Sequence, residues 1–138
     1  MPIRLGFGFS ALVHMFARNY EISCDHAERA IRLSPFDPLN YHPYLALSWV
    51  YLFTNRNEEA GRYANLAIQV NPGFSVLYPA LVVSHVRLDR LGEAQKAGLR
   101  LLETAPDWRV DSFIRMGLVH PDHVDGFAAA LRTAGLPG

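Results

Sequence analysis

The sequence contains a single cysteine, Cys24, and a single lysine, Lys96, among its 138 residues. One thiol cannot form an internal disulfide or a cysteine-based metal cage, and such scarcity favours a reducing, cytoplasmic compartment. One lysine leaves no lysine cluster for Schiff-base or P-loop chemistry. The two scarcities together argue against several common kinds of catalytic and cofactor site.

Neither sign of charge is in excess. Lys and Arg total 13 and Asp and Glu total 13, with six of each up to Val70 and seven of each after it. A polyanion-binding surface needs clustered cations, so we expect no nucleic-acid partner. No uncharged apolar run reaches the roughly 18 residues of a membrane helix, because Arg18, Arg56 and Arg87 interrupt the richest stretches. We therefore expect a soluble protein of a single domain.

Three similar segments follow one another along the chain. Ala60 and Ala94 are 34 residues apart, as are Pro72 and Pro106, while Pro35 precedes Pro72 by 37. The surplus of three residues is Pro38-Leu39-Asn40, between the first two units. Regular self-similarity at this period is typical of helical repeat proteins.

This pattern resembles the tetratricopeptide (TPR) helix-turn-helix repeat. The resemblance implies an all-α superhelix, with units at 4–37, 41–74 and 75–108 and a C-terminal cap at 109–138. Family positions are occupied as follows: the large residue by Phe7, Tyr44 and Tyr78, the later aromatic by His14, Tyr51 and His85, the early alanine by Ser23, Ala60 and Ala94, and later small residues by Ala27, Ala64, Gly98, Ala30 and Ala67. Departures are Ser10 for leucine in the first unit, and Val82 and Leu101 for small residues in the third.

After Pro106 the period fades into two shorter segments, Asp111 to Leu118 and Pro121 to Leu136, which we expect to form the cap. The end of the chain, from ETAPDW through HPDHVDGFAAALRTAGLPG, is also similar to the C-terminal TPR region of bacterial adenylate cyclase-like and winged-helix regulatory proteins. No cyclase or DNA-binding domain fits within this chain, so those activities are not implied for it.

Candidate catalytic and metal sites are weak. Cys24 and His26 are two apart on a predicted helix and point about 200° apart, so they cannot pair within it. His120 and His123 have a metal-compatible spacing but few further ligands, and a helix cap with Asp122 in its first turn explains them better. We therefore expect no enzyme activity, no cofactor and no metal.

The TPR resemblance implies a concave groove lined by the first helices of the units. Its lining is apolar, with one cation at the far end, which suits an amphipathic or extended apolar segment of a protein partner. Two accounts stay open: a partner fills the groove, or the chain covers part of it through Phe113, Ile114, Met116, Phe127 and Leu131. The expected groove residues are Leu12, Met15, Phe16, Leu45, Trp49, Leu52, Phe53, Val83 and Arg87.

The first predicted helix has almost no polar face. A helix that is apolar all round must be buried on more than one side, so we expect a homodimer or larger assembly through this N-terminal edge. The residues that make this helix apolar are Ile3, Leu5, Phe7, Phe9, Leu12, Val13, Met15 and Phe16.

The function that these observations favour is a non-catalytic protein-interaction module, a TPR scaffold or adaptor. The first alternative is a regulatory TPR domain, or a fragment of a larger bacterial cyclase-like or transcriptional regulatory protein. A small-molecule sensor is a further alternative.

Overall fold

The computed structural model describes residues 6–138, and these form helices and connecting turns without any β-strand. The all-α class is therefore confirmed for this part of the chain. Contacts divide the chain into two compact units, the first ending at Pro72 and the second running from Gly73 to Gly138. This division lies within two residues of the boundary expected between the second and third repeats. Within the described residues, no helix has the length and apolar character needed to cross a bilayer.

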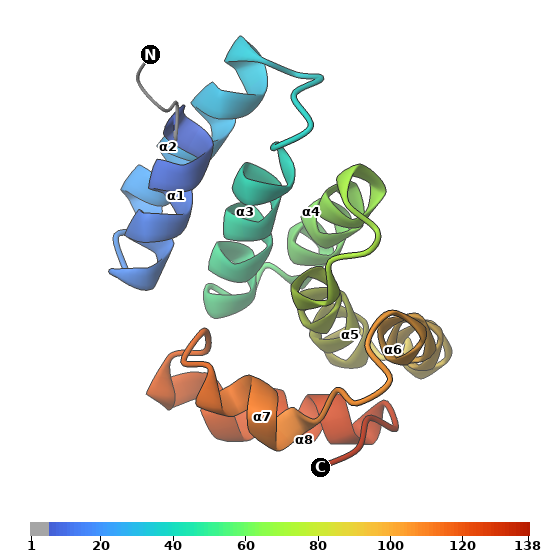
Figure 1. Cartoon of the computed structure of the whole chain (residues 1–138). Helices are drawn as coiled ribbons and strands as arrows, with labels where there is room; N and C mark the ends of the chain where they lie inside the picture. Colours follow the sequence, from blue (N-terminus) through green and yellow to red (C-terminus); the bar gives the residue numbers. More distant parts are fainter. Residues whose placement is uncertain (1–5) are drawn as a thin grey trace. The chain divides into compact units, whose positions relative to one another are not determined.

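Unit 1 consists of two helical hairpins (Figure 1). Helices α1 (Gly6–Phe16) and α2 (Tyr20–Leu33) form the first, and α3 (Tyr41–Phe53) and α4 (Asn57–Val70) form the second. Helix α3 packs against α4 and also against both helices of the first hairpin. The core of unit 1 is thus centred on α3, whose sequence contains no Asp, Glu, Lys or Arg.

Unit 2 contains one further hairpin and the C-terminal segments. The 3-10 turn η1 (Ser75–Leu77) leads into α5 (Tyr78–Arg87), which pairs with α6 (Leu91–Thr104). Helix α7 (Val110–Arg115), the 3-10 turn η2 (Pro121–His123) and α8 (Val124–Thr133) follow, and α8 packs against both α5 and α7. Both segments expected in the cap are therefore helical, although each helix is shorter than expected.

The three hairpin turns share one backbone geometry. Arg18, Asn55 and Asp89 have positive φ angles of 64°, 62° and 59°, and they are separated by 37 and then 34 residues. The residue after each of them donates its backbone N–H to the carbonyl five residues before that donor. The acceptors are the carbonyls of His14, Tyr51 and His85 respectively, each at 2.8 Å. This is the left-handed closing turn with which many helices end. The repeat seen in the sequence is thus present in the backbone.

Small residues lie where the two helices of a hairpin meet. Ser23, Ala60 and Ala94 hold equivalent places and are each 0% exposed. Because the first unit has serine there, its hydroxyl must find a partner, and Ser23 Oγ donates to the Ala11 carbonyl at 2.7 Å. Leu101, which replaces the late alanine of the third unit, is also 0% exposed. Close helix packing at small residues therefore holds in all three hairpins, with one larger residue accommodated in unit 2.

Candidate functional site

The residues expected to line a groove are mostly buried in the structure. On α1 and α3 of unit 1, Met15, Leu45, Trp49 and Leu52 are 3%, 7%, 1% and 1% exposed. Leu12 and Phe53 are half-buried, and Phe16, at 52%, is the exposed member of the set. Leu5, another apolar residue of the expected first helix, and Ile3 lie outside the described residues.

Aromatic packing explains why the middle of α3 is inaccessible. The rings of Trp49 and Phe53 lie 5.9 Å apart, and Tyr20 of α2 stacks on Phe53 at 5.7 Å. Large rings in such offset contacts contribute to a core as well as to interfaces. In this conformation Trp49 belongs to the core, and its role as a partner contact stays a prediction.

In unit 2 the C-terminal helix covers the groove face of α5. Val83 on α5 is 0% exposed, as are Phe127 and Leu131 on α8. The guanidinium of Arg87 lies 4.8 Å from the centre of the Phe127 ring, a cation–π contact. Burial lowers the pKa of Arg87 because the charged form loses hydration. The cation expected at the open end of a groove is thus half-buried against the chain's own helix.

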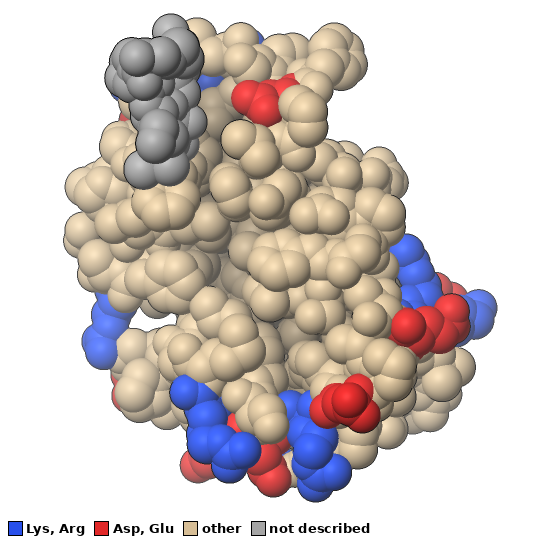
Figure 2. All heavy atoms as spheres, viewed as in Figure 1, with Lys and Arg blue, Asp and Glu red and all other residues tan. Residues whose placement is uncertain are grey.

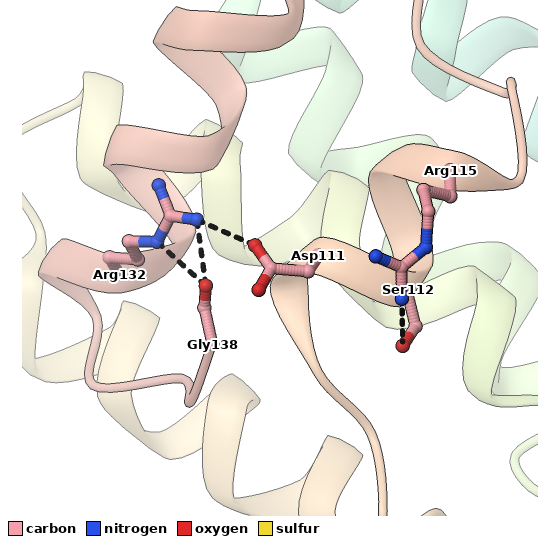
Figure 3. Close-up of polar contacts among 5 residues, drawn as sticks. All are labelled: Asp111, Ser112, Arg115, Arg132 and Gly138. Atoms are coloured by element: carbon pink, nitrogen blue, oxygen red, sulfur yellow. Dashed lines mark hydrogen bonds and ion pairs between the residues drawn. The ribbon is translucent and has the colours of Figure 1, made fainter.

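The end of the chain holds this cover in place (Figure 3). Arg132 of α8 donates from Nε and Nη2 to the Gly138 oxygen, at 3.0 and 2.7 Å, and from Nη2 to the Asp111 carboxylate at 3.0 Å. The Pro137 carbonyl accepts from the backbone N–H of Val110 at 2.8 Å. These bonds tie the last residues of unit 2 to both ends of the α7–α8 segment.

In unit 1, large apolar side chains of the first hairpin and of the loop that follows it stay exposed. On α1, Phe9, Leu12, Val13 and Phe16 recur at the spacing of a single helix face. We name the exposed set the first-hairpin face. In the view of Figure 2, few charged side chains lie over α1 and α3. The first-hairpin face consists of Phe9 (39%), Val13 (50%), Phe16 (52%), Leu33 (69%), Phe36 (96%) and Leu39 (51%).

A pocket of about 260 Å³ opens beside this face. It lies within unit 1, between the start of α1, the end of α2 and the loop that leads into α3. Burial lowers the pKa of His42 in its wall, although the Asp37 carboxylate opposes the shift. The pocket is lined by Gly6, Phe7, Gly8, Phe9, Ala30, Leu33, Ser34, Asp37, Leu39, Asn40, His42 and Pro43.

A hydroxyl–imidazole pair lies between α1 and α2. Ser10 Oγ is 2.7 Å from His26 Nδ1, and the rings of Phe7 and His14 lie edge-on to His26 at 5.3 and 5.2 Å. The neighbouring Cys24 thiol, half-buried on α2, has a raised pKa, chiefly through burial. The thiol therefore stays protonated near neutral pH and is a poor nucleophile.

Of the two histidines near the C-terminus, His120 provides a cap. His120 Nδ1 accepts the backbone N–H of Asp122 at 3.0 Å and so caps the turn η2. As expected, Asp122 lies in the first turn of the helical segment, which begins at Pro121. The sequence did not show that the His120 imidazole accepts the capping hydrogen bond, or that a 3-10 turn precedes α8, which starts at Val124. No group of three His, Cys, Asp or Glu within residues 6–138 could hold a metal ion.

Sequence reasoning missed Phe36, Leu33 and Leu39. The available signal was the 37-residue spacing between Pro35 and Pro72, because the additional residues Pro38-Leu39-Asn40 lengthen this one inter-repeat loop. Loops carry a disproportionate share of binding residues. The sequence marked the place, although it did not show that Phe36 would be 96% exposed.

No model of a known protein family matches this chain, and a search of curated proteins finds no match to it. The resemblance to the TPR repeat therefore stays a prediction from the sequence, and the structure adds three hairpins that share one closing turn.

Proposed function

We propose that this chain is a non-catalytic protein-interaction module built from TPR-type hairpins, which binds a protein partner through its first-hairpin face. The observation that carries the proposal is the exposure of six large apolar side chains in one part of unit 1: Phe9, Val13 and Phe16 on α1, Leu33 at the end of α2, and Phe36 and Leu39 in the loop that follows. An apolar patch beyond a few hundred Å² seldom stays uncovered on a protein that acts alone.

The chemistry of the face defines the class of partner. The outward side of α1 offers Phe9, Leu12, Val13 and Phe16 in a row, and no acidic or basic side chain other than His14 lies within α1. Such a row complements the apolar side of a partner helix. Phe16 is shared with the groove expected from the sequence, so the proposed surface begins at its edge. Homo-oligomers through the N-terminal helix would use the same row.

Two measurements on purified protein test the proposal. The double substitution Val13→Arg with Phe16→Ser should strongly reduce the binding of a hydrophobic dye. It should also remove whichever protein the wild-type chain retains from a lysate of its source. The control Met116→Arg alters a side chain that is 60% exposed in unit 2, and it should change neither result. Equal dye uptake by the wild type and the double variant, at unchanged helix content, would contradict the proposal.

A further inference from the structure

We infer that the partner of the first-hairpin face is a second copy of this chain, with Phe36 of each copy inserted into the pocket of the other. The inference deepens the proposed function and rests on it, since it names the occupant of the same face. It starts from the loop between α2 and α3, where a projecting ring lies next to a ring-sized hollow.

Phe36 is the projecting element. Its side chain is 96% exposed, the highest value among the large apolar residues of the described chain. Residues on either side of it, Ser34, Asp37 and Leu39, line the pocket, whereas Phe36 does not. A phenylalanine this exposed gains nothing for the fold of a single copy, because hydrophobic stabilisation follows the area removed from water.

The pocket has the size and lining that a phenyl ring needs. Its volume is about 260 Å³. A cavity of about 150 Å³ lined by apolar side chains is already large enough for benzene. Phe7, Phe9, Leu33 and Pro43 supply apolar walls. A Phe36 ring from outside therefore fits within the available space and meets side chains of its own kind.

Projection and hollow on one face are what a two-fold pair requires. In an isologous dimer the same patch is used twice, so each residue and its complement must both lie on that patch. Here the loop of residues 34–40 contributes to both. The exposed row of α1 continues from the pocket, because Phe9 belongs to the pocket and to the first-hairpin face. The contact would thus extend beyond a single inserted ring.

The acid Asp37 belongs to both elements, because it follows Phe36 and also lines the pocket, so in a symmetric pair it needs a cation from the other copy. Asp37 follows Phe36 directly and is exposed, and one of its oxygens accepts the Leu39 backbone N–H at 2.9 Å. Arg29 is exposed and does not line the pocket, but its guanidinium lies 4.9 Å from the centre of the ring of Phe7, which does. When Phe36 enters the pocket of a second copy, Asp37 approaches Arg29 of that copy. Complementary charges of this kind favour one pairing and speed association.

Sedimentation velocity from about 1 to 100 µM tests the inference, a range in which a modest interface associates. The wild type should form dimers, and Phe36→Ala should raise the dissociation constant about thirtyfold or more, as expected of a central aromatic anchor. Met116→Ala, an exposed site in unit 2, is the control and should leave the constant unchanged. A wild type that stays monomeric, or a Phe36→Ala protein that dimerises like the wild type, would overturn the inference.

A mixing experiment separates ring insertion from an indirect effect of Phe36. Ser34→Trp should block the pocket. Ser34 is exposed, and the hydrogen bonds seen for it use its backbone: its N–H donates to the Ala30 carbonyl at 3.1 Å, and its carbonyl accepts from Asn40 Nδ2 at 2.7 Å. Leu39→Trp is the second choice if that variant fails to fold. Each single variant should associate weakly, whereas a mixture of Phe36→Ala with Ser34→Trp keeps one intact ring-and-pocket contact and should associate better than either alone. A mixture without this gain would refute insertion.

Exchanging the charges of Asp37 and Arg29 provides a further test. Asp37→Arg and Arg29→Asp should each weaken the dimer at low salt, and the double variant should recover much of the loss. Failure of the dimer tests would remove the second copy as the partner. The proposed function would then be decided separately by the dye and capture measurements, so the two failures are distinguishable.

Discussion

Units 1 and 2 are built from similar helical hairpins, but they differ in whether the apolar side chains on the outside of a hairpin are buried or exposed. In unit 2, α8 packs on α5 and buries Phe127 and Leu131 completely. In unit 1, the first hairpin keeps Phe9, Val13 and Phe16 exposed. A hairpin repeat carries apolar residues on more than one side, so whatever follows or faces it decides whether they become core or interface. The difference is that α8 covers α5 in unit 2, whereas the apolar row of α1 stays open in unit 1; unit 2 also leaves apolar side chains exposed, but elsewhere, among them Leu91, Leu99 and Met116.

The same substitution in the two units should give the largest contrast. Phe127→Ala removes a fully buried ring and should lower the free energy of unfolding by about 3–5 kcal/mol. Phe36→Ala removes an exposed ring and should change it by less than about 0.5 kcal/mol at a protein concentration too low for association. Urea unfolding measures both. Similar losses for the two variants would mean that the contrast between a covered and an open unit is wrong.

At one pair of equivalent positions, unit 1 has a small side chain and unit 2 has a large one. Replacing each by the size found in the other unit should destabilise both units. Ala67→Leu crowds the α3–α4 hairpin of unit 1, where Ala67 is 0% exposed, and should cost about 1–3 kcal/mol. Leu101→Ala, one repeat later, leaves a cavity in unit 2 and should cost about 2–5 kcal/mol. Thermal unfolding of both variants is the measurement. If either substitution were neutral, the register that makes these two positions equivalent would be wrong.

The closing bonds of unit 2 should have a smaller effect. Arg132→Ala removes the hydrogen bonds to Gly138 and Asp111, but the side chains of Arg132 and Asp111 are 51% and 49% exposed. Water and salt screen such a pair, so we expect a loss of about 1 kcal/mol in the free energy of unfolding. Arg115→Ala is the matched control, since Arg115 makes a long 3.5 Å bond to Ser112 (Figure 3). A control that costs as much as Arg132→Ala would contradict this role for the C-terminal contacts.

The sequence predicted the hairpins better than it predicted their surfaces. Small residues at Ala60, Ala64 and Ala94 fix where two helices meet, and this local requirement repeats with the period of the chain. The closing turns at Arg18, Asn55 and Asp89 follow the same spacing. Such features are predictable because each depends on residues only a few positions apart.

Exposure could not be predicted in the same way. Trp49 and Phe16 both occupy expected groove positions, yet one is 1% and the other 52% exposed. Which of them is covered depends on contacts between segments far apart in sequence, and a repeat pattern does not specify these. After the period has ended, the sequence predicted a short helix and a helix cap, but it did not fix the bounds of α7 or show that the His120 imidazole accepts the capping hydrogen bond.

The smallest expected effect concerns pH, and it compares one histidine from each unit. Burial lowers the pKa of His42 in unit 1, with Asp37 opposing. Burial, Arg87 and His120 lower the pKa of His123 in unit 2, with Asp122 opposing. In an unfolded chain the pKa of a histidine is about 6.5. The folded protein therefore binds these protons less readily than the unfolded chain, and the stability associated with each neutral ring is lost as the pH falls below that value.

Urea unfolding between pH 5 and 7.5 tests the sign of this effect. The free energy of unfolding should decrease toward pH 5 for the wild type, and less steeply for His42→Gln and His123→Gln. Because His42 lines the pocket of unit 1, a partner ring that covers the pocket would withdraw it further from water. The slope removed by His42→Gln should then be larger at concentrations where the chain associates, while the slope removed by His123→Gln should not change with concentration. Stability that rises on acidification, or Gln variants with the full wild-type slope, would show that these rings are not held in their neutral form.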